Sequence, residues 1–139
     1  MTLSNERGSA LIITLMLLLI LTAIGIYAIS ISTTEMSIAL QSKTGTMLLN
    51  SADSGANYGI DQIPSVFTGL QHGTLPDGSS YDWKSRTTET MTTKPGYGAN
   101  YAFVDFEVES TGNPTPQFAG QRTVQAVVNY GPVPVGTMY

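Results

Sequence analysis

Residues 8–31 read GSALIITLMLLLILTAIGIYAISI, and no charged residue interrupts the chain from Gly8 to Thr34. A helix needs about 20 apolar residues to cross the hydrocarbon core of a bilayer, and this run meets that length. The run is too long and too apolar for the core helix of so small a soluble protein. Arg7 stands directly before it and Lys43 is the next basic residue, so the sequence predicts one membrane span with a cytoplasmic N-terminus.

The composition of the chain restricts what the remainder can do. The chain has 139 residues, a net charge of −4 and no cysteine. About 80 residues remain after the span and its extension, enough for one small domain with a thin core. The lack of cysteine excludes disulfides, thiol chemistry and cysteine-based zinc sites. The basic residues form no cluster, which argues against nucleic acid as a partner. No Gly-x-Ser-x-Gly motif occurs, and we expect neither an enzyme nor a cofactor.

The short leader before the span carries a specific signal, Glu6-Arg7-Gly8 followed by Ser9-Ala10-Leu11-Ile12-Ile13. Leader and span together resemble the class III signal of type IV prepilins. In that family a prepilin peptidase cuts after the glycine and methylates the new N-terminus, which here places the cut between Gly8 and Ser9. More narrowly, the span and the later stretch Leu49-Asn-Ser-Ala-Asp-Ser-Gly-Ala-Asn57 resemble the N-terminal region of PilX-type minor pilins, over roughly residues 6–60.

The resemblance implies a function in assembly. It implies a minor pilin or pseudopilin that assembles into, primes or supports a type IV pilus or a related filament. The implied partners are the major pilin, other minor pilins, the prepilin peptidase and the inner-membrane assembly platform, with membrane lipid before assembly. The implied location is the bacterial inner membrane, as a single-pass protein, and then an extracellular or periplasmic filament.

One position departs from the family pattern. Most pilins carry a glutamate at the fifth mature position, which pairs with the N-terminal amine of a neighbouring subunit; here that position is Ile13. A carboxylate at membrane depth costs roughly 2.5–3.5 kcal/mol on insertion scales, so it persists only with a purpose. A chain that offers the amine of Ser9 but no carboxylate fits the tip of a filament. The alternative is that the glutamate was lost by drift in a non-essential subunit of low abundance.

Two other interpretations of the N-terminal region stay open. Ala28-Ile29-Ser30 has small residues at the spacing of a signal-peptidase site, and cleavage there would release a secreted domain. An uncleaved single span would instead anchor an extracytoplasmic domain that binds a ligand or partner. The first residue of the mature protein separates these interpretations from the pilin.

An amphipathic helix is predicted to continue the span. Apolar residues recur near helical spacing from Ser32 to Ile63, and Pro64 disfavours helix at the residue before it. Residues 9–63 as one helix would measure about 82 Å. We therefore expect a leader at 1–8, a transmembrane or filament-core half-helix at 9–31, an amphipathic half-helix at 32–63 and a small β-rich extracytoplasmic domain at 64–139. Gly25 and the hydroxyl-rich run 30–34 have low helix propensity, so any loss of helix in a filament is expected between Gly25 and Thr34.

The C-terminal part alternates between strands and turns. We expect a loop at 67–80, a strand or hairpin arm at 81–93, a turn at 94–98, a strand at 100–110, a loop at 111–116 and a strand at 120–130. The tail 131–139 is expected to be exposed and extended. The prediction is an α+β, pilin-like fold in which one long N-terminal helix packs on a small antiparallel β-sheet.

Few side chains of this domain suggest chemistry. Asp105, Glu107 and Glu109 lie at alternate positions of one strand, where neighbours are close enough to share a calcium ion. A solvated strand face that blunts edge pairing is the simpler interpretation, because no calcium-loop motif is present. His72 is the only histidine and is expected to be a loop residue. Aromatic residues could form an adhesive patch or pack the thin core: Tyr81, Trp83, Tyr97 and Tyr101.

Overall fold

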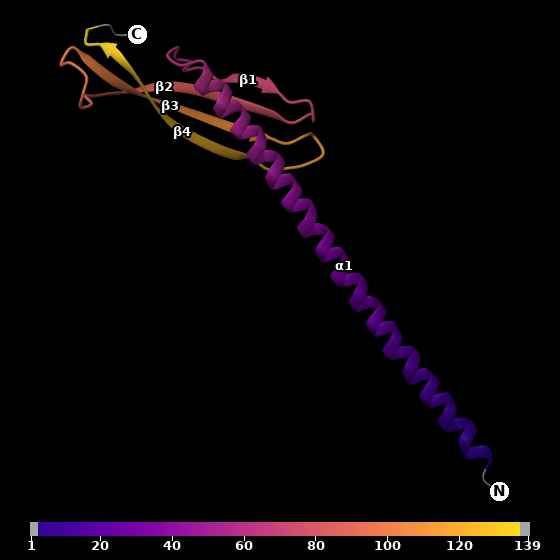
Figure 1. Ribbon diagram of the computed structural model, residues 1–139. Coiled ribbons are helices and arrows are strands. Elements are labelled where there is room, and N and C mark those ends of the chain that lie inside the picture. Colours follow the sequence, from indigo (N-terminus) through magenta and orange to yellow (C-terminus); the bar gives the residue numbers. More distant parts are fainter. Residues whose placement is uncertain (1–2, 137–139) are drawn as a thin grey trace. The chain divides into compact units, whose positions relative to one another are not determined.

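The computed structural model of the protein describes the backbone of residues 3–136, and the side chains of these residues except 3–7 and Glu89. One helix, α1 (Leu3–Asp61), is followed by four strands: β1 (Gln71–Thr74), β2 (Ser80–Thr92), β3 (Tyr101–Asn113) and β4 (Arg122–Pro134). The chain divides into two compact units, Met1–Ser42 and Lys43–Tyr139. The α+β class predicted from the sequence, a long N-terminal helix with a small antiparallel sheet, is confirmed (Figure 1).

Helix α1 ends at Asp61, two residues before the predicted end at Ile63. The reason is visible in the hydrogen bonds that follow. The amide of Gln62 donates to the carbonyl oxygen of Gly59 at 3.3 Å, and that of Ile63 donates to Ile60 at 3.1 Å. Both hydrogen bonds join residues three apart, not four apart as in an α-helix. They tighten the chain into a turn before Pro64, as is common at helix ends. The run from Gly25 to Thr34 is helical here, so its loss of helix in a filament stays a prediction.

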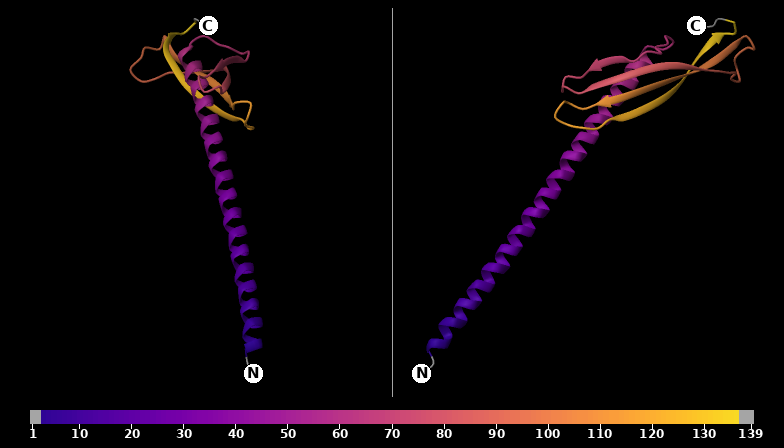
Figure 2. Two further views of the ribbon diagram at one scale, coloured as in Figure 1. Left: turned by 90° about the vertical axis from the view of Figure 1, so that its right-hand side faces the viewer. Right: turned by 180° about the vertical axis from the view of Figure 1, so that it is seen from behind.

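The sheet is antiparallel throughout, with the strand order β1-β2-β3-β4 (Figure 2). The predicted strands at 81–93, 100–110 and 120–130 correspond to β2, β3 and β4. The predicted loop at 67–80 is partly wrong, because it contains β1, which pairs with the start of β2 from Gln71↔Trp83 to Thr74↔Ser80. Residues 71–74 include a glycine and a histidine and lack alternation, so the sequence pattern did not indicate a strand.

Two further boundaries differ from the prediction. β3 continues through the expected loop to Asn113, because Thr111 and Gly112 still pair with Thr123 and Arg122. β4 continues through the expected tail to Pro134, and Val133 is buried. A β-bulge explains why the prolines are tolerated there. Register moves from Val104↔Tyr130 to Ala102↔Val133, so Gly131 and Pro132 together oppose one residue of β3. Residues 137–139 of the expected tail lie outside the described residues.

The core of the second unit lies between the end of α1 and one face of β2 and β3. The buried side chains of this part of α1 are small, apart from Leu48, and recur at helical spacing: Ser51, Ala52, Gly55, Ala56 and Gly59. Added Cβ atoms would lie 2.3 Å from Ser110 Oγ at Gly55 and 2.6 Å from Val108 Cγ1 at Gly59. The helix therefore approaches the sheet through residues that lack bulk, and Trp83, Phe106 and Val108 fill the space around them.

Candidate functional site

The apolar part of α1 is the first candidate. Gly8 and Ser9, on either side of the predicted cleavage, are exposed and helical, and the side chain of Ile13 is 56% exposed. The part of α1 from Gly8 to Asp61 is long and apolar enough to cross a membrane, with a mean hydropathy of 2.7 over its most apolar window and none of that window buried. Large apolar side chains are exposed along the whole run: Leu11, Ile12, Leu15, Met16, Leu17, Leu18, Leu19, Ile20, Leu21, Ile24, Ile26, Tyr27, Ile29 and Ile31.

Two threonine hydroxyls within this run, and two just beyond it, bond to the backbone of the helix itself. Thr14 Oγ1 donates to the carbonyl oxygen of Leu11 at 2.8 Å, and Thr22 Oγ1 donates to that of Leu18. Further along, Thr33 and Thr34 both donate to Ser30 at 2.9 Å. In hydrocarbon a polar group without a partner costs several kcal/mol, so internal pairing makes these threonines compatible with lipid. These four hydroxyl groups can therefore meet either lipid or other apolar helices without leaving a donor unpaired.

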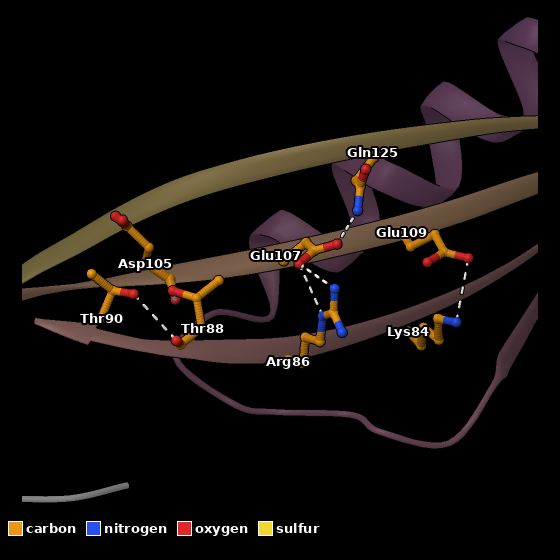
Figure 3. A network of polar contacts seen from close by, with 8 residues as sticks. All are labelled: Lys84, Arg86, Thr88, Thr90, Asp105, Glu107, Glu109 and Gln125. Carbon is orange, nitrogen blue, oxygen red and sulfur yellow. Dashed lines mark hydrogen bonds and ion pairs between the residues drawn. The ribbon is translucent and has the colours of Figure 1, made fainter.

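The carboxylates of β3 form the second candidate, on the sheet face opposite α1 (Figure 3). Arg86 donates from Nε at 2.9 Å and from Nη2 at 2.7 Å to Oε2 of Glu107, and Gln125 donates to the other oxygen. Lys84 Nζ lies 3.3 Å from Glu109, and Asn129 donates to Asp105 at 2.6 Å. Each carboxylate has its own partner from a neighbouring strand, so the three do not converge on a shared cation.

This arrangement corrects one part of the sequence interpretation. β3 lies between β2 and β4, so its acidic residues do not blunt an edge. Residue Glu107 is only 9% exposed, and Arg86 and Lys84 supply the positive charge that a bound ion would otherwise supply. Within the described residues no group of three or more His, Cys, Asp or Glu could hold a metal. Lys84 and Arg86 were not predicted as the partners of these carboxylates. The two basic residues alternate along β2 as the acidic residues alternate along β3, and this pattern of opposite charges indicates strands that face each other.

His72 lies on β1 and not in a loop, which corrects its predicted place. It faces Asp82 across the β1–β2 pair, and its Nδ1 lies 2.8 Å from Asp82 Oδ1. Asn113 Nδ2 donates to the other oxygen of Asp82 at 2.8 Å. The hydrogen bond from His72 is the largest cause of the lowered pKa of Asp82; burial opposes it, and the hydrogen bond from Asn113 adds to the lowering. The group ties the short strand β1 to the sheet.

The aromatic residues do not gather into one patch. Trp83 is buried, with Tyr58 and Phe67 against its edge at centroid distances of 5.7 and 5.2 Å. Beside them is an open hollow of about 360 Å³, whose lining includes Tyr81 and His72. Tyr97 and Tyr101 are exposed near the opposite end of β3, where Tyr97 meets Phe103 edge to face at 5.0 Å. Core packing therefore accounts for Trp83, and the proposed patch of four is not formed.

Comparison with known proteins bears on the N-terminal part of the chain. Residues 7–57 match the family model described as PilX N-terminal. The comparisons with curated proteins and with solved structures give no match. The matched region starts one residue before Gly8, includes the whole apolar run and ends within the small-residue stretch that packs on the sheet. The resemblance inferred from the sequence is thus confirmed: residues 7–57 are similar to the N-terminal region of PilX, a type IV pilus minor pilin.

Proposed function

We propose that the protein is a minor pilin or pseudopilin that is cleaved between Gly8 and Ser9 and then assembles into, primes or supports a type IV pilus or a related filament. The observation that carries the proposal is the uncharged, exposed helix that directly follows Glu6-Arg7-Gly8, inside a region that matches PilX. Cleavage at this junction would remove the charged leader and leave the apolar helix at the start of the mature chain.

The assembly step follows from the physical properties of this helix. Lipid tails and neighbouring spans are both apolar, so transfer from bilayer to filament changes the hydrophobic free energy little, and close packing decides the outcome. The proposed partners are the major pilin, other minor pilins, the prepilin peptidase and the inner-membrane platform. The proposed location is the inner membrane with a cytoplasmic N-terminus, and then the filament. The small sheet domain would be displayed on the outside.

Ile13 gives the proposal a position within the filament. The chain offers the amine of Ser9 to a neighbour's glutamate but has no carboxylate at residue 13 to offer in return. A subunit that accepts this contact on one side only is suited to the tip, where one neighbour is missing.

The proposal is tested by filament fractionation with a variant that blocks processing. Gly8 has nothing within 4 Å of an added Cβ, so Gly8→Val leaves the described packing intact. In cells with an active prepilin peptidase, we expect the wild-type protein in sheared filaments and the variant only in membranes. Gly45→Ala, at another open position of the same helix, is the matched control and should follow the wild type. Equal recovery of Gly8→Val in filaments, or absence of the wild type from them, would contradict the proposal.

A further inference from the structure

Strand β4 is a long edge of the sheet. It pairs with β3 along one side over residues 122–134, and no strand of the described structure lies along its other side (Figures 1 and 2). The opposite edge of the sheet is better protected. There β1 has only four residues, and beyond it the backbone of Phe67 bonds to Ser85, with its carbonyl oxygen 2.7 Å from the Ser85 amide. Lys84 and Arg86 also lie on that side.

β4 lacks the features that usually prevent edge pairing. Natural edges are blunted by charges, prolines, bulges or short length. Here Arg122 stands at one end, and the bulge at Gly131–Pro132 stands at the other. The eight residues between them read TVQAVVNY, without a charge, a proline or a glycine. Val127 is 65% exposed within this window. The window is therefore an open row of backbone donors and acceptors with strong β propensity.

The sequence of the window is close to symmetric about Ala126. Val124 and Val128 flank it on the face toward α1, and Gln125 and Val127 flank it on the opposite face. If two such strands run antiparallel with Ala126 opposite Ala126, every residue meets one from the same face. Face matching of this kind is what fixes register between strands. The apolar row of one sheet would then continue into the apolar row of the other.

The ends of the strand also complement each other in this register. Arg122 of one copy would lie opposite Tyr130 of the other copy, on the same face of the sheet. The two-fold axis repeats this contact, so each dimer would contain it twice. Arg122 is exposed and forms no ion pair within the described residues, and the side chain of Tyr130 is 36% exposed. A guanidinium beside an aromatic ring is a favourable cation–π contact. Arg122 is the only charged residue of β4, so no like charges meet.

We propose that β4 is a self-association edge, which pairs antiparallel with β4 of a second copy of this chain about a two-fold axis at Ala126. Two four-stranded sheets would thereby become one continuous sheet. Such an isologous interface is closed, so it produces a dimer and not an open fibre. The proposal does not require cleavage at Gly8, so it can fail or hold independently of the pilin function.

A cysteine scan tests the axis directly, because the natural chain contains no cysteine. Residues that face each other across antiparallel strands have Cα atoms about 4.5–5.5 Å apart, within the range that a disulfide bridges. Diagonal neighbours lie about 7–8 Å apart, beyond that range. Full-length Ala126→Cys in detergent, under mild oxidation, should form at least about fivefold more covalent dimer than Val127→Cys or Gln125→Cys. Gln117→Cys, exposed in the β3–β4 loop, reports random collisions.

A charge exchange provides the second arm. The two copies of residue 127 are diagonal neighbours across the axis, so Val127→Lys or Val127→Glu in the Ala126→Cys background should each reduce the covalent dimer. An equal mixture of the two should restore it, while Gln117→Lys should change nothing. Three results would overturn the proposal: a maximum of covalent dimer at another position, equal yields of dimer at all positions, or a mixture of the Lys and Glu variants that forms no more dimer than either variant alone. Cross-linking to another protein in membranes without self-cross-linking would overturn it as well.

Discussion

Arg86 donates two hydrogen bonds to a single oxygen of Glu107, from Nε at 2.9 Å and from Nη2 at 2.7 Å (Figure 3). The two residues pair in register across β2 and β3, and the glutamate side chain is only 11% exposed. Gln125 of β4 donates to the other carboxylate oxygen. One largely buried carboxylate thus connects the three long strands on the face that α1 does not cover.

Removal of the arginine should leave this carboxylate short of donors. We expect Arg86→Ala to lower the free energy of unfolding by about 1–2 kcal/mol, in the lower range for hydrogen bonds to charged groups because the Arg86 side chain is 68% exposed. Lys84→Ala removes the partner of Glu109, a carboxylate that is 38% exposed and so remains hydrated, and should cost less than about 1 kcal/mol. Urea unfolding followed by the fluorescence of Trp83, the only tryptophan, measures both. Equal losses in the two variants would contradict the role given to Glu107.

Close approach of helix and sheet gives a second prediction. At Gly55 an added Cβ would lie 2.3 Å from Ser110 Oγ and 2.6 Å from the ring of Tyr81. Ser110 is fully buried, so its hydroxyl has little room to yield. We expect Gly55→Ala to destabilise the domain by about 1–3 kcal/mol, as overpacking does. Gly45→Ala, with nothing within 4 Å, should instead be neutral or stabilising by up to about 1 kcal/mol. The order of the two unfolding midpoints checks this, and a reversed order would refute the packing described.

Acid should weaken the attachment of β1. The pKa of Asp82 is lowered from its ordinary 3.8, chiefly by the hydrogen bond from His72. A carboxyl group with a lowered folded-state pKa contributes stability above its unfolded pKa, and loses it as the pH falls through the folded value. The unfolding free energy of the wild type should therefore decline more steeply than that of Asp82→Asn below about pH 4. Parallel pH profiles, measured by urea unfolding at several pH values, would show that this contact does not stabilise the fold.

Ile13→Glu tests the tip position. The substitution supplies a carboxylate to which the amine of Ser9 in another subunit would donate, so the variant could occupy both ends of the contact. If the tip role holds, the variant should be displaced into the shaft and should lower the number of filaments per cell. Filament counts and co-purification with the major pilin measure the effect. Unchanged or increased piliation would count against the tip role.

The sequence predicted the long-range plan of the fold from two periodicities. The uncharged run 8–31 and the helical spacing after it predicted α1, and the alternation of residues 102–108 and 124–130 predicted β3 and β4. The packing of α1 was less visible, because the buried stripe includes Gly55 and Gly59, which carry no hydrophobic signal. A helix that lies this close to a sheet needs residues without a side chain at the contact. The need becomes visible only when the facing surface of the sheet is known.

The strand ends escaped prediction for local reasons. Pro132 and Pro134 argue against a strand, yet a bulge on an edge strand accommodates the first of them, and β4 runs to Pro134. The carboxylates of β3 were found, but their partners depend on the register of the strands, which the spacing of Lys84 and Arg86 suggests and does not by itself fix. The division into a leader at 1–8, a span at 9–31, an amphipathic half at 32–63 and a β-rich domain from residue 64 stays a prediction that processing and membrane topology will test.

The mass and first residue of the mature protein test the account most directly. Purified from cells with an active prepilin peptidase, the protein should begin at Ser9 and carry one methyl group on that amine. A chain that begins at Met1 would mark a simple membrane anchor, and one that begins at Ile31 would mark a secreted domain. Either of those results would contradict the filament function.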